Sequence, residues 1–296
     1  ITGKPIVTKD FQWETTLNLS GNRGRLGDFI DGVDIFYVTD AQVGAAKAGS
    51  IPNGGYFLGL TGNKYETAQG PDGKMYNVID PSTGLYKDTQ VETNIVGNRE
   101  PKLIGGFNNS FSYKNFNLSF LFDIRLGGDI YNGTEYYFVT KGLSTKTINR
   151  ESVSFTGVVN TGTAAKPSYE TKTITYNANE TYQVGNSTRS GKYMIQEYYK
   201  NYAKNAYNFI TDTNWLRLRS ISLSYDFKDL LKKQNIIKGL TATITGTNLF
   251  VWTNYKGMDP ETCVSGSGTG GSGSAGIDYC GVPATAGMSF GINLTF

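Results

Sequence analysis

Histidine is absent from this 296-residue sequence, which removes the commonest general base and the commonest transition-metal ligand of proteins. Only two cysteines are present, and the pattern does not tie two acidic residues together on neighbouring predicted strands. A Ser-His-Asp, Cys-His or paired-carboxylate site therefore cannot be assembled. The sequence predicts that the protein is not an enzyme, with no catalytic residue, no cofactor and no metal site.

Clustered charge and long apolar runs are missing too. The chain has 28 Lys and Arg against 25 Asp and Glu, a net charge of +3, and its basic residues are scattered. This pattern does not predict a nucleic-acid surface. No stretch approaches the ~18 continuous apolar residues of a membrane helix, so this chain can cross a bilayer only as strands of a closed barrel.

Aromatic residues and glycine are abundant, with 20 Tyr, 16 Phe and 37 Gly against 8 Pro. This composition is typical of aromatic-rich strands joined by flexible loops. The clearest strand is 286–296, where one face collects the apolar residues Met288, Phe290, Ile292, Leu294 and Phe296. A strand of about 9–11 residues with one apolar face is typical of an outer-membrane crossing. A soluble sandwich strand also alternates, but an apolar aromatic ending with no polar tail favours the barrel.

The same alternation predicts six crossing strands, at about residues 11–20, 103–113, 116–125, 215–227, 240–250 and 286–296. Their connections alternate in length, and the long ones are 21–102, 127–213 and 251–285. Outer-membrane barrels place short turns in the periplasm and long loops outside, so these three are predicted to be extracellular. Six strands cannot close a membrane barrel, because known ones start at about eight. We therefore expect an all-β chain, the C-terminal six antiparallel strands of a larger transmembrane β-barrel.

Two pairs of charged residues inside the predicted strands indicate how the strands face. Asp123 and Arg125 share the inward face, where a watery lumen tolerates charge. Arg217 and Arg219 instead share the parity of the apolar residues that follow them, so they are expected at the height of the headgroups or loops.

Two segments between the strands have helical features. Residues 192–209 lack Gly and Pro and space their aromatics at near-helical intervals, which predicts a helix within the long loop. Its tyrosines fit local packing better than a ligand platform. Residues 228–239 are predicted to be a turn that contains one helical turn.

Cys263 and Cys280 lie in the last long loop with sixteen residues between them. Outside the cell a disulfide is permitted, and closing such a loop stabilises a fold by about 3 kcal/mol in the entropic model. The Gly/Ser run 265–276 would otherwise leave the loop loose, so a Cys263–Cys280 bridge is predicted over two unpaired thiols. The run lacks the ending of a phosphate-binding loop and is interpreted as flexible.

Acidic residues near the loops offer weak alternatives for a cation site. Asp259, Glu261 and Asp278 could supply oxygen ligands to Ca²⁺, but turn capping and solvated carboxylates are the favoured interpretation. Asp28, Asp31 and Asp34 lack the closing glutamate of a calcium loop.

Trp252 and Tyr255 lie just beyond a predicted strand end. They are candidate substrate-binding residues, because aromatic rings stack on sugars. The favoured interpretation is that they pack locally or join the aromatic belt at the membrane interface.

Two regions resemble the SusC/RagA family of TonB-dependent outer-membrane transporters of Bacteroidetes. The first, residues 95–136, reads IVGNREPKLIGGFNNSFSYKNFNLSFLFDIRLGGDIYNGTEY. The second combines TNWLRLRSISLSYDF, LTATITGTNLFVWTNYKGMDPE and GIDYCGVPATAGMSFGINLTF. Together they cover about half of the chain in the family's order and spacing, which is far more specific than one short motif.

The resemblance implies the C-terminal strands of a barrel of about 22 strands with a plugged lumen. It also implies import of oligosaccharides or oligopeptides driven through TonB, with a SusD-like surface lipoprotein as a lid. The plug domain and the TonB box are absent from this sequence, so this segment alone is not expected to be energised. Phe296 resembles the terminal aromatic that the outer-membrane assembly machinery recognises.

Two other functions stay open at this point. A TonB-dependent receptor for siderophores or cobalamin, working without a lipoprotein lid, ends in similar strands. A secreted β-sandwich adhesin or lectin would use the long loops as a binding face and would remain soluble without detergent.

Overall fold

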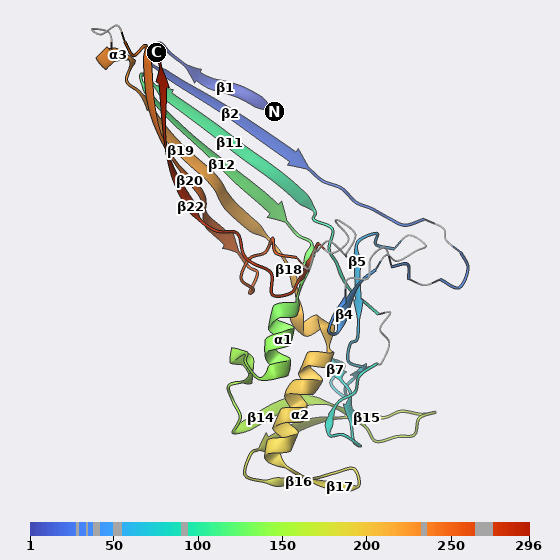
Figure 1. The fold of residues 1–296 in the computed structure, drawn as a ribbon. Helices are drawn as coiled ribbons and strands as arrows, with labels where there is room; N and C mark the ends of the chain where they lie inside the picture. Colours follow the sequence, from blue (N-terminus) through green and yellow to red (C-terminus); the bar gives the residue numbers. More distant parts are fainter. Residues whose placement is uncertain are drawn as a thin grey trace.

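A computed structural model describes residues 1–27, 30–33, 35–37, 42–49, 55–89, 94–231, 236–263 and 275–296. A long twisted sheet forms one part of the molecule, and a lobe of short strands and helices lies at one end of it (Figure 1). We call these two parts the wall and the lobe.

The wall is a seven-stranded antiparallel sheet in the order β1-β2-β11-β12-β19-β20-β22. Its strands are Thr2–Val7 (β1), Phe11–Ser20 (β2), Leu103–Tyr113 (β11), Phe116–Leu126 (β12), Trp215–Asp226 (β19), Gly239–Thr253 (β20) and Gly287–Thr295 (β22). All six predicted strands are present, which confirms the expected fold class. β1 was missed because it is short, contains a proline and pairs with β2 through an irregular register.

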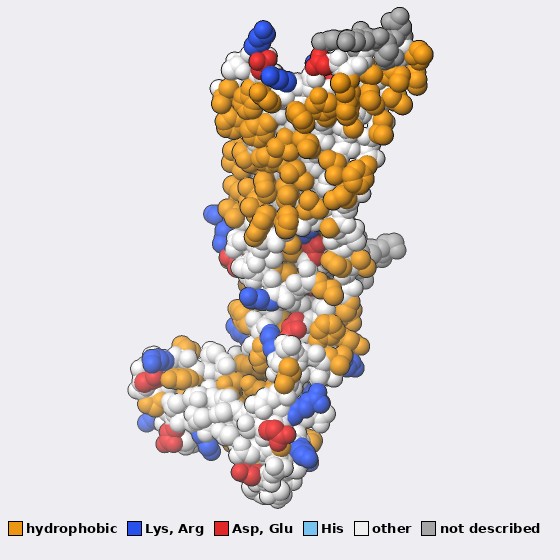
Figure 2. Space-filling view, turned by 90° about the vertical axis from the view of Figure 1, so that its left-hand side faces the viewer, with side chains coloured by type: hydrophobic (Ala, Val, Ile, Leu, Met, Phe, Trp, Pro, Cys, Tyr) orange, Lys and Arg blue, Asp and Glu red, His pale blue; other side chains and the backbone are white. Residues whose placement is uncertain are grey.

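One face of the wall is apolar and exposed. In β22, Met288, Phe290 and Ile292 are 65%, 77% and 73% exposed. The hydrophobic side chains form a broad band over this face (Figure 2). Aromatic contacts cross the band from strand to strand, with Phe111 5.7 Å from Trp13 and 5.9 Å from Phe120 between ring centroids. A band of this kind is stable only against an apolar surrounding such as lipid.

The opposite face of the wall is polar. Ser222 and Thr245, on neighbouring strands, share a hydrogen bond of 2.9 Å between their hydroxyls. A β-sandwich would bury an apolar face under a second sheet, but no second sheet formed by the described residues covers this one. The sandwich adhesin is therefore excluded as an interpretation of this fold.

Short and long connections leave opposite ends of the wall. The turn at Lys114 and Asn115 and the segment with the single-turn helix α3 (Lys228–Leu231) lie at one end, and all three long connections meet at the other (Figure 1). The predicted helical turn at 228–239 is confirmed.

The three long connections fold together into the lobe. One four-stranded sheet contains Ile95–Asn98 (β10), Gly59–Gly62 (β5), Ala46–Gly49 (β4) and Gln42–Val43 (β3), and a three-stranded sheet contains Ile210–Asp212 (β18), Asp129–Asn132 (β13) and Ile277–Asp278 (β21). Four hairpins pair Thr67–Gln69 (β6) with Met75–Asn77 (β7), Ile79–Asp80 (β8) with Leu85–Tyr86 (β9), Ser152–Asn160 (β14) with Tyr169–Asn177 (β15), and Thr181–Val184 (β16) with Ser187–Ser190 (β17). The helices are Gly133–Lys141 (α1), Gly191–Lys204 (α2), and the 3-10 turns Thr145–Thr147 and Ala206–Phe209. None of the helices in the described part of the chain is both long and apolar enough to cross a membrane.

A single hydrophobic cluster joins the three connections. It contains Leu60 from the first, Tyr131 and Phe209 from the second and Ile277 from the third, all 3% exposed or less. The three long connections look separate in the sequence, but they form one packed body, because each buries its few apolar residues against the other two.

The helix expected within residues 192–209 is confirmed as α2. Its first turn is capped by Ser190, whose side chain accepts a hydrogen bond from the N–H of Tyr193. Tyr198 stacks on Phe155 with 5.2 Å between ring centroids, and burial raises the pKa of its hydroxyl to about 12. This tyrosine packs locally, as the favoured interpretation predicts.

Candidate functional site

The junction between wall and lobe is organised by a bulge in β19. Leu218 pairs with Phe122 on one side and Phe250 on the other, whereas Ser220 pairs with Leu121 and Thr247, so Arg219 has no partner in either ladder. On β20 the bulge is matched by Asn248, which has a left-handed backbone with φ 51°. An extra residue reverses the side-chain alternation beyond it. The polar face of β19 therefore continues with Arg217.

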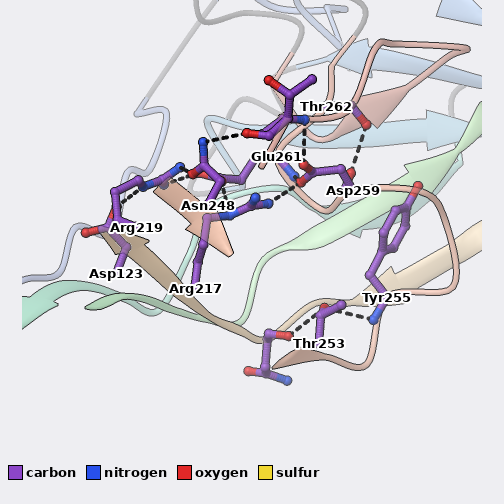
Figure 3. A network of polar contacts seen from close by, with 12 residues as sticks. Asp123, Arg217, Arg219, Asn248, Thr253, Tyr255, Asp259, Glu261 and Thr262 are labelled. Carbon is purple, nitrogen blue, oxygen red and sulfur yellow. Dashed lines mark hydrogen bonds and ion pairs between the residues drawn. The ribbon is translucent and has the colours of Figure 1, made fainter. Parts of the chain in front are cut away.

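Arg217 is buried and paired with two carboxylates from the loop after β20 (Figure 3). Its Nη2 donates to Asp259 Oδ1 over 2.5 Å, and its Nε lies 2.6 Å from Glu261 Oε2. The second contact is an ion pair that does not meet hydrogen-bond geometry. The side chains of Arg217 and Asp259 are only 2% and 5% exposed, so each charge depends on the other for stabilisation.

Arg219 extends this network across the wall (Figure 3). Its Nε donates to Asp123 Oδ2 over 2.6 Å on β12, and its Nη2 donates to Glu261 Oε1 over 2.8 Å. Both arginines lie near the loop end of β19, as expected, and pair with carboxylates of the loop after β20. The apolar parity expected for Arg217 is wrong, because the bulge turns this residue to the polar face. The inward placement of Asp123 is confirmed.

Asp259 also caps the turn that carries Glu261. Its carboxylate accepts the N–H groups of Glu261 and Ala284, at 2.9 and 3.0 Å, and its backbone carbonyl accepts the Thr262 hydroxyl. The turn-capping interpretation is confirmed for Asp259. Glu261 instead pairs with the two arginines, and buried Asp278 accepts side-chain hydroxyls. Among the described residues no cluster of three or more acidic or cysteine side chains is arranged to hold a metal ion, and Asp28 and Asp34 lie outside the described residues.

Tyr255 is buried beneath the lobe. It is 5% exposed, and its hydroxyl donates to Asp278 Oδ2 over 2.7 Å. The other oxygen of that carboxylate accepts the Thr134 hydroxyl at 3.1 Å. Burial, followed by the nearby Asp278 charge, raises the pKa of the Tyr255 hydroxyl, which keeps it protonated as a donor. The burial of Tyr255 fits local packing, the favoured interpretation, and a role in substrate binding stays a prediction.

Removing the Tyr255 hydroxyl should loosen the lobe. Tyr255→Phe leaves buried Asp278 with one hydroxyl donor fewer, which should lower the free energy of unfolding by about 1–3 kcal/mol. Thermal unfolding of the detergent-solubilised protein measures this effect. Tyr279→Phe, at a residue that is 41% exposed, is the matched control and should change nothing. Equal melting temperatures for the two variants would contradict the assigned role of Tyr255.

Trp252 lies on the apolar face at the loop end of β20. It is 53% exposed, stacks on Phe250 at 5.9 Å and lies 6.4 Å from Phe122 between ring centroids. This position fits the interfacial aromatic belt, the alternative to substrate stacking. Phe296 is 71% exposed beyond β22, and its role in assembly stays a prediction.

The predicted disulfide is not formed. Cys263 and Cys280 both lie in the described part of the chain, and no bond joins them. The N–H of Cys280 donates to the Thr134 hydroxyl over 2.6 Å, which fixes it at the start of α1. Cys263 follows the turn that Asp259 holds against the wall. The structure therefore does not contain the predicted bridge. Residues 264–274 of the intervening run lie outside the described residues.

Buried Arg99 is a junction residue that the sequence did not single out. Its Nη1 donates to the carbonyl of Ala275 over 2.7 Å and its Nε to that of Gly59 over 3.3 Å, so it ties the first loop to the third. Burial lowers its pKa to about 10. Its only signal in the sequence was its position in the run GNREP, residues 97–101, within the first region that resembles the SusC/RagA family.

A polar cavity lies at the junction, and another lies farther out in the lobe. The first, of about 610 Å³, opens where β2 ends and β11 begins, and charged residues of both signs line it, including Arg23, Arg25, Glu100, Lys102 and Asp129. The second, of about 790 Å³, lies beside α2. Both volumes are in the range of small-ligand sites.

Curated relatives match the chain over its whole length. TonB-dependent receptor P3 of Formosa agariphila is 23% identical over 313 residues, covering 100% of this chain and 28% of the relative. TonB-dependent receptor SusC of Bacteroides thetaiotaomicron is 24% identical over 302 residues, covering 100% of this chain and 26% of the relative. The chain is thus similar over its whole length to TonB-dependent receptors that include SusC. No protein-family model matches it.

Solved structures agree on the fold. The RagAB peptide transporter superposes with a TM-score of 0.56 at 18% identity, covering 100% of this chain and 28% of that one. The match falls on the C-terminal part of the barrel. The chain spans 26–30% of the length of its curated relatives. Its wall belongs in the outer membrane.

Proposed function

We propose that this chain supplies part of the wall and the extracellular lobe of an importer that takes oligosaccharides or oligopeptides across the outer membrane. TonB drives the import, and a SusD-like surface lipoprotein is the partner that covers the lobe. The relatives support this proposal: they include the TonB-dependent receptor SusC and the RagAB peptide transporter.

One observation carries the proposal: three long connections form a single lobe that is tied to the barrel wall. The lobe core joins all three, and Arg217 anchors the last of them to β19 through Asp259. A rigid lobe at the loop end of a lipid-facing wall places polar cavities where a solute would enter. The cavity of about 610 Å³ at the strand ends, with cations and carboxylates in its lining, fits a polar oligomer.

Uptake by the native host tests the function. Cells that lack the protein should remove either an oligosaccharide mixture or an oligopeptide mixture from the medium more slowly than the wild type, as followed by mass spectrometry. Loss of TonB should reproduce the defect. Unchanged removal of both mixtures would contradict the proposal.

The partner needs a separate test. A tagged form of the full-length protein, extracted in mild detergent, should retain a surface lipoprotein through purification. Purification without a lipoprotein, combined with tight binding of a siderophore or cobalamin, would favour the receptor that works without a lid.

A further inference from the structure

A pocket of about 470 Å³ lies between the two long helices of the lobe. One face of α2 contributes residues at helical spacing, and the end of α1 with the segment after it forms the other side. The lining residues from α2 are Lys192, Ile195, Gln196, Tyr199 and Lys200. From the other side come Val139, Lys141, Arg150 and Glu151, among others. The pocket is thus built by two helices and has the volume of a small-ligand site.

The floor of the pocket is apolar and fixed. Val139 and Ile195 are 2% and 3% exposed. The Tyr199 hydroxyl donates to the carbonyl of Asn149 over 2.8 Å, which holds its ring in place. Burial raises the pKa of Tyr199, and the positive charge of Arg150 opposes part of this rise. Arg150 and Tyr199 line the same pocket, so the guanidinium lies near a group that would bind beside the ring.

The rim of the pocket is positively charged. Lys141, Arg150 and Lys192 form no ion pair with any residue in the described ranges, whereas Lys200 is paired with Glu197 at 2.7 Å. Glu151 is the one carboxylate in the lining. Arg150 is held in position by donating from Nη2 to the carbonyl of Gly142 over 2.9 Å, at the end of α1. Three cations against one carboxylate leave a positive pocket in a chain whose charges are otherwise nearly balanced.

We propose that this pocket between α1 and α2 binds the carboxylate of an acidic oligomer, with Lys141, Arg150 and Lys192 around the anion and Tyr199 against the adjoining apolar part. This inference rests on the proposed import function and names the charge of its substrate. A carboxylate can come from a uronic-acid sugar or from an acidic peptide, and the shared recognition is a charge-assisted hydrogen bond to Lys or Arg.

Calorimetric titration of the full-length protein in detergent tests the pocket with four probes. These are trigalacturonate and triglutamate, with maltotriose and trialanine as their neutral counterparts. At least one acidic probe should bind about ten-fold or more tightly than its counterpart, and the affinity should fall as added salt screens the charges. The acidic probe that binds identifies the source of the carboxylate. If neither acidic probe bound more tightly than its neutral counterpart, the proposal would be overturned.

A matched pair of variants locates the binding. Lys192→Gln removes one rim charge at an exposed helix position and should weaken the acidic probe about five-fold. Lys172→Gln, at an exposed position of β15 outside the lining, should leave affinity unchanged. Equal melting temperatures show that both variants are folded, and equal affinities would overturn the assignment. Binding in detergent does not require transport. If the acidic probe bound but cells took up neither mixture, only the import function would be rejected. If cells took up a mixture but no acidic probe bound preferentially, only the role of this pocket would be rejected.

Discussion

Lysine at position 292 is expected to remove most of the protein from the outer membrane, whereas lysine at position 293 is expected to be tolerated. Ile292 is 73% exposed in the middle of β22 on the apolar face, and Asn293 belongs to the opposite, polar face. A lysine on the lipid side near the bilayer midplane costs about 2–4 kcal/mol, while a watery lumen accepts it. The two substitutions differ only in the face on which the charge is placed.

The measurement is the amount of full-length protein in purified outer membranes, read by quantitative immunoblot. Heat-modifiable migration of the same samples reports whether the barrel is folded. Ile292→Lys should reduce both signals strongly, and Asn293→Lys should match the wild type. If the two variants reached the membrane equally, the apolar face would not be the lipid face.

Arg217→Met is expected to be among the most destabilising single changes at the junction. It removes the cation that faces Asp259, whose side chain is 5% exposed, and breaking a buried pair in this way costs about 3–5 kcal/mol. The variant should unfold at a lower temperature in detergent and lose protease resistance in residues 254–263. Lys256→Met, an exposed residue of the same loop, is the control and should behave as wild type.

A second substitution separates the charge from the packing. In Arg217→Met with Asp259→Asn, the orphaned negative charge is gone, so part of the lost stability should return. If Arg217→Met melted at the same temperature as Lys256→Met, the network would not hold the loop to the wall. If the double variant were less stable than Arg217→Met, the buried charge of Asp259 would not be the cause.

Long alternating strands were predictable because each repeats its pattern over nine or more residues. β11, β12 and β22 each present one apolar face, which a period of two reveals without any knowledge of their partners. The connection lengths then placed the long loops at one end of the wall. These strands and connections could be predicted because each strand repeats its pattern over many residues.

The bulge at Arg219 could not be predicted in the same way. A single residue inserted between two alternating stretches leaves the local pattern unchanged. Only the pairing of Ser220 with Leu121 and Thr247, which skips Arg219, reveals the shift. The inward turn of Arg217 follows from that pairing. The sequence pattern assigned Arg217 to the apolar face, because the register that turns it inward depends on the pairing of three strands.

The lobe and its buried polar contacts could not be predicted from the sequence, for a related reason. Its strands are often two to four residues long, too short to show a period. Tyr255 is buried because Asp278, 23 residues away, accepts its hydroxyl. No local signal distinguishes a tyrosine held in this way from one that is open to a ligand.

The orientation of the lobe is the central claim, and labelling of cysteines on intact cells tests it most directly. The background is Cys263→Ser with Cys280→Ser. Asn186→Cys lies in the exposed turn between β16 and β17 of the lobe, and Lys9→Cys lies in the exposed turn between β1 and β2 at the other end of the wall. With a membrane-impermeant maleimide, Asn186→Cys should be labelled on intact cells and Lys9→Cys only after the outer membrane is opened. Labelling of Lys9→Cys alone on intact cells would contradict an extracellular lobe.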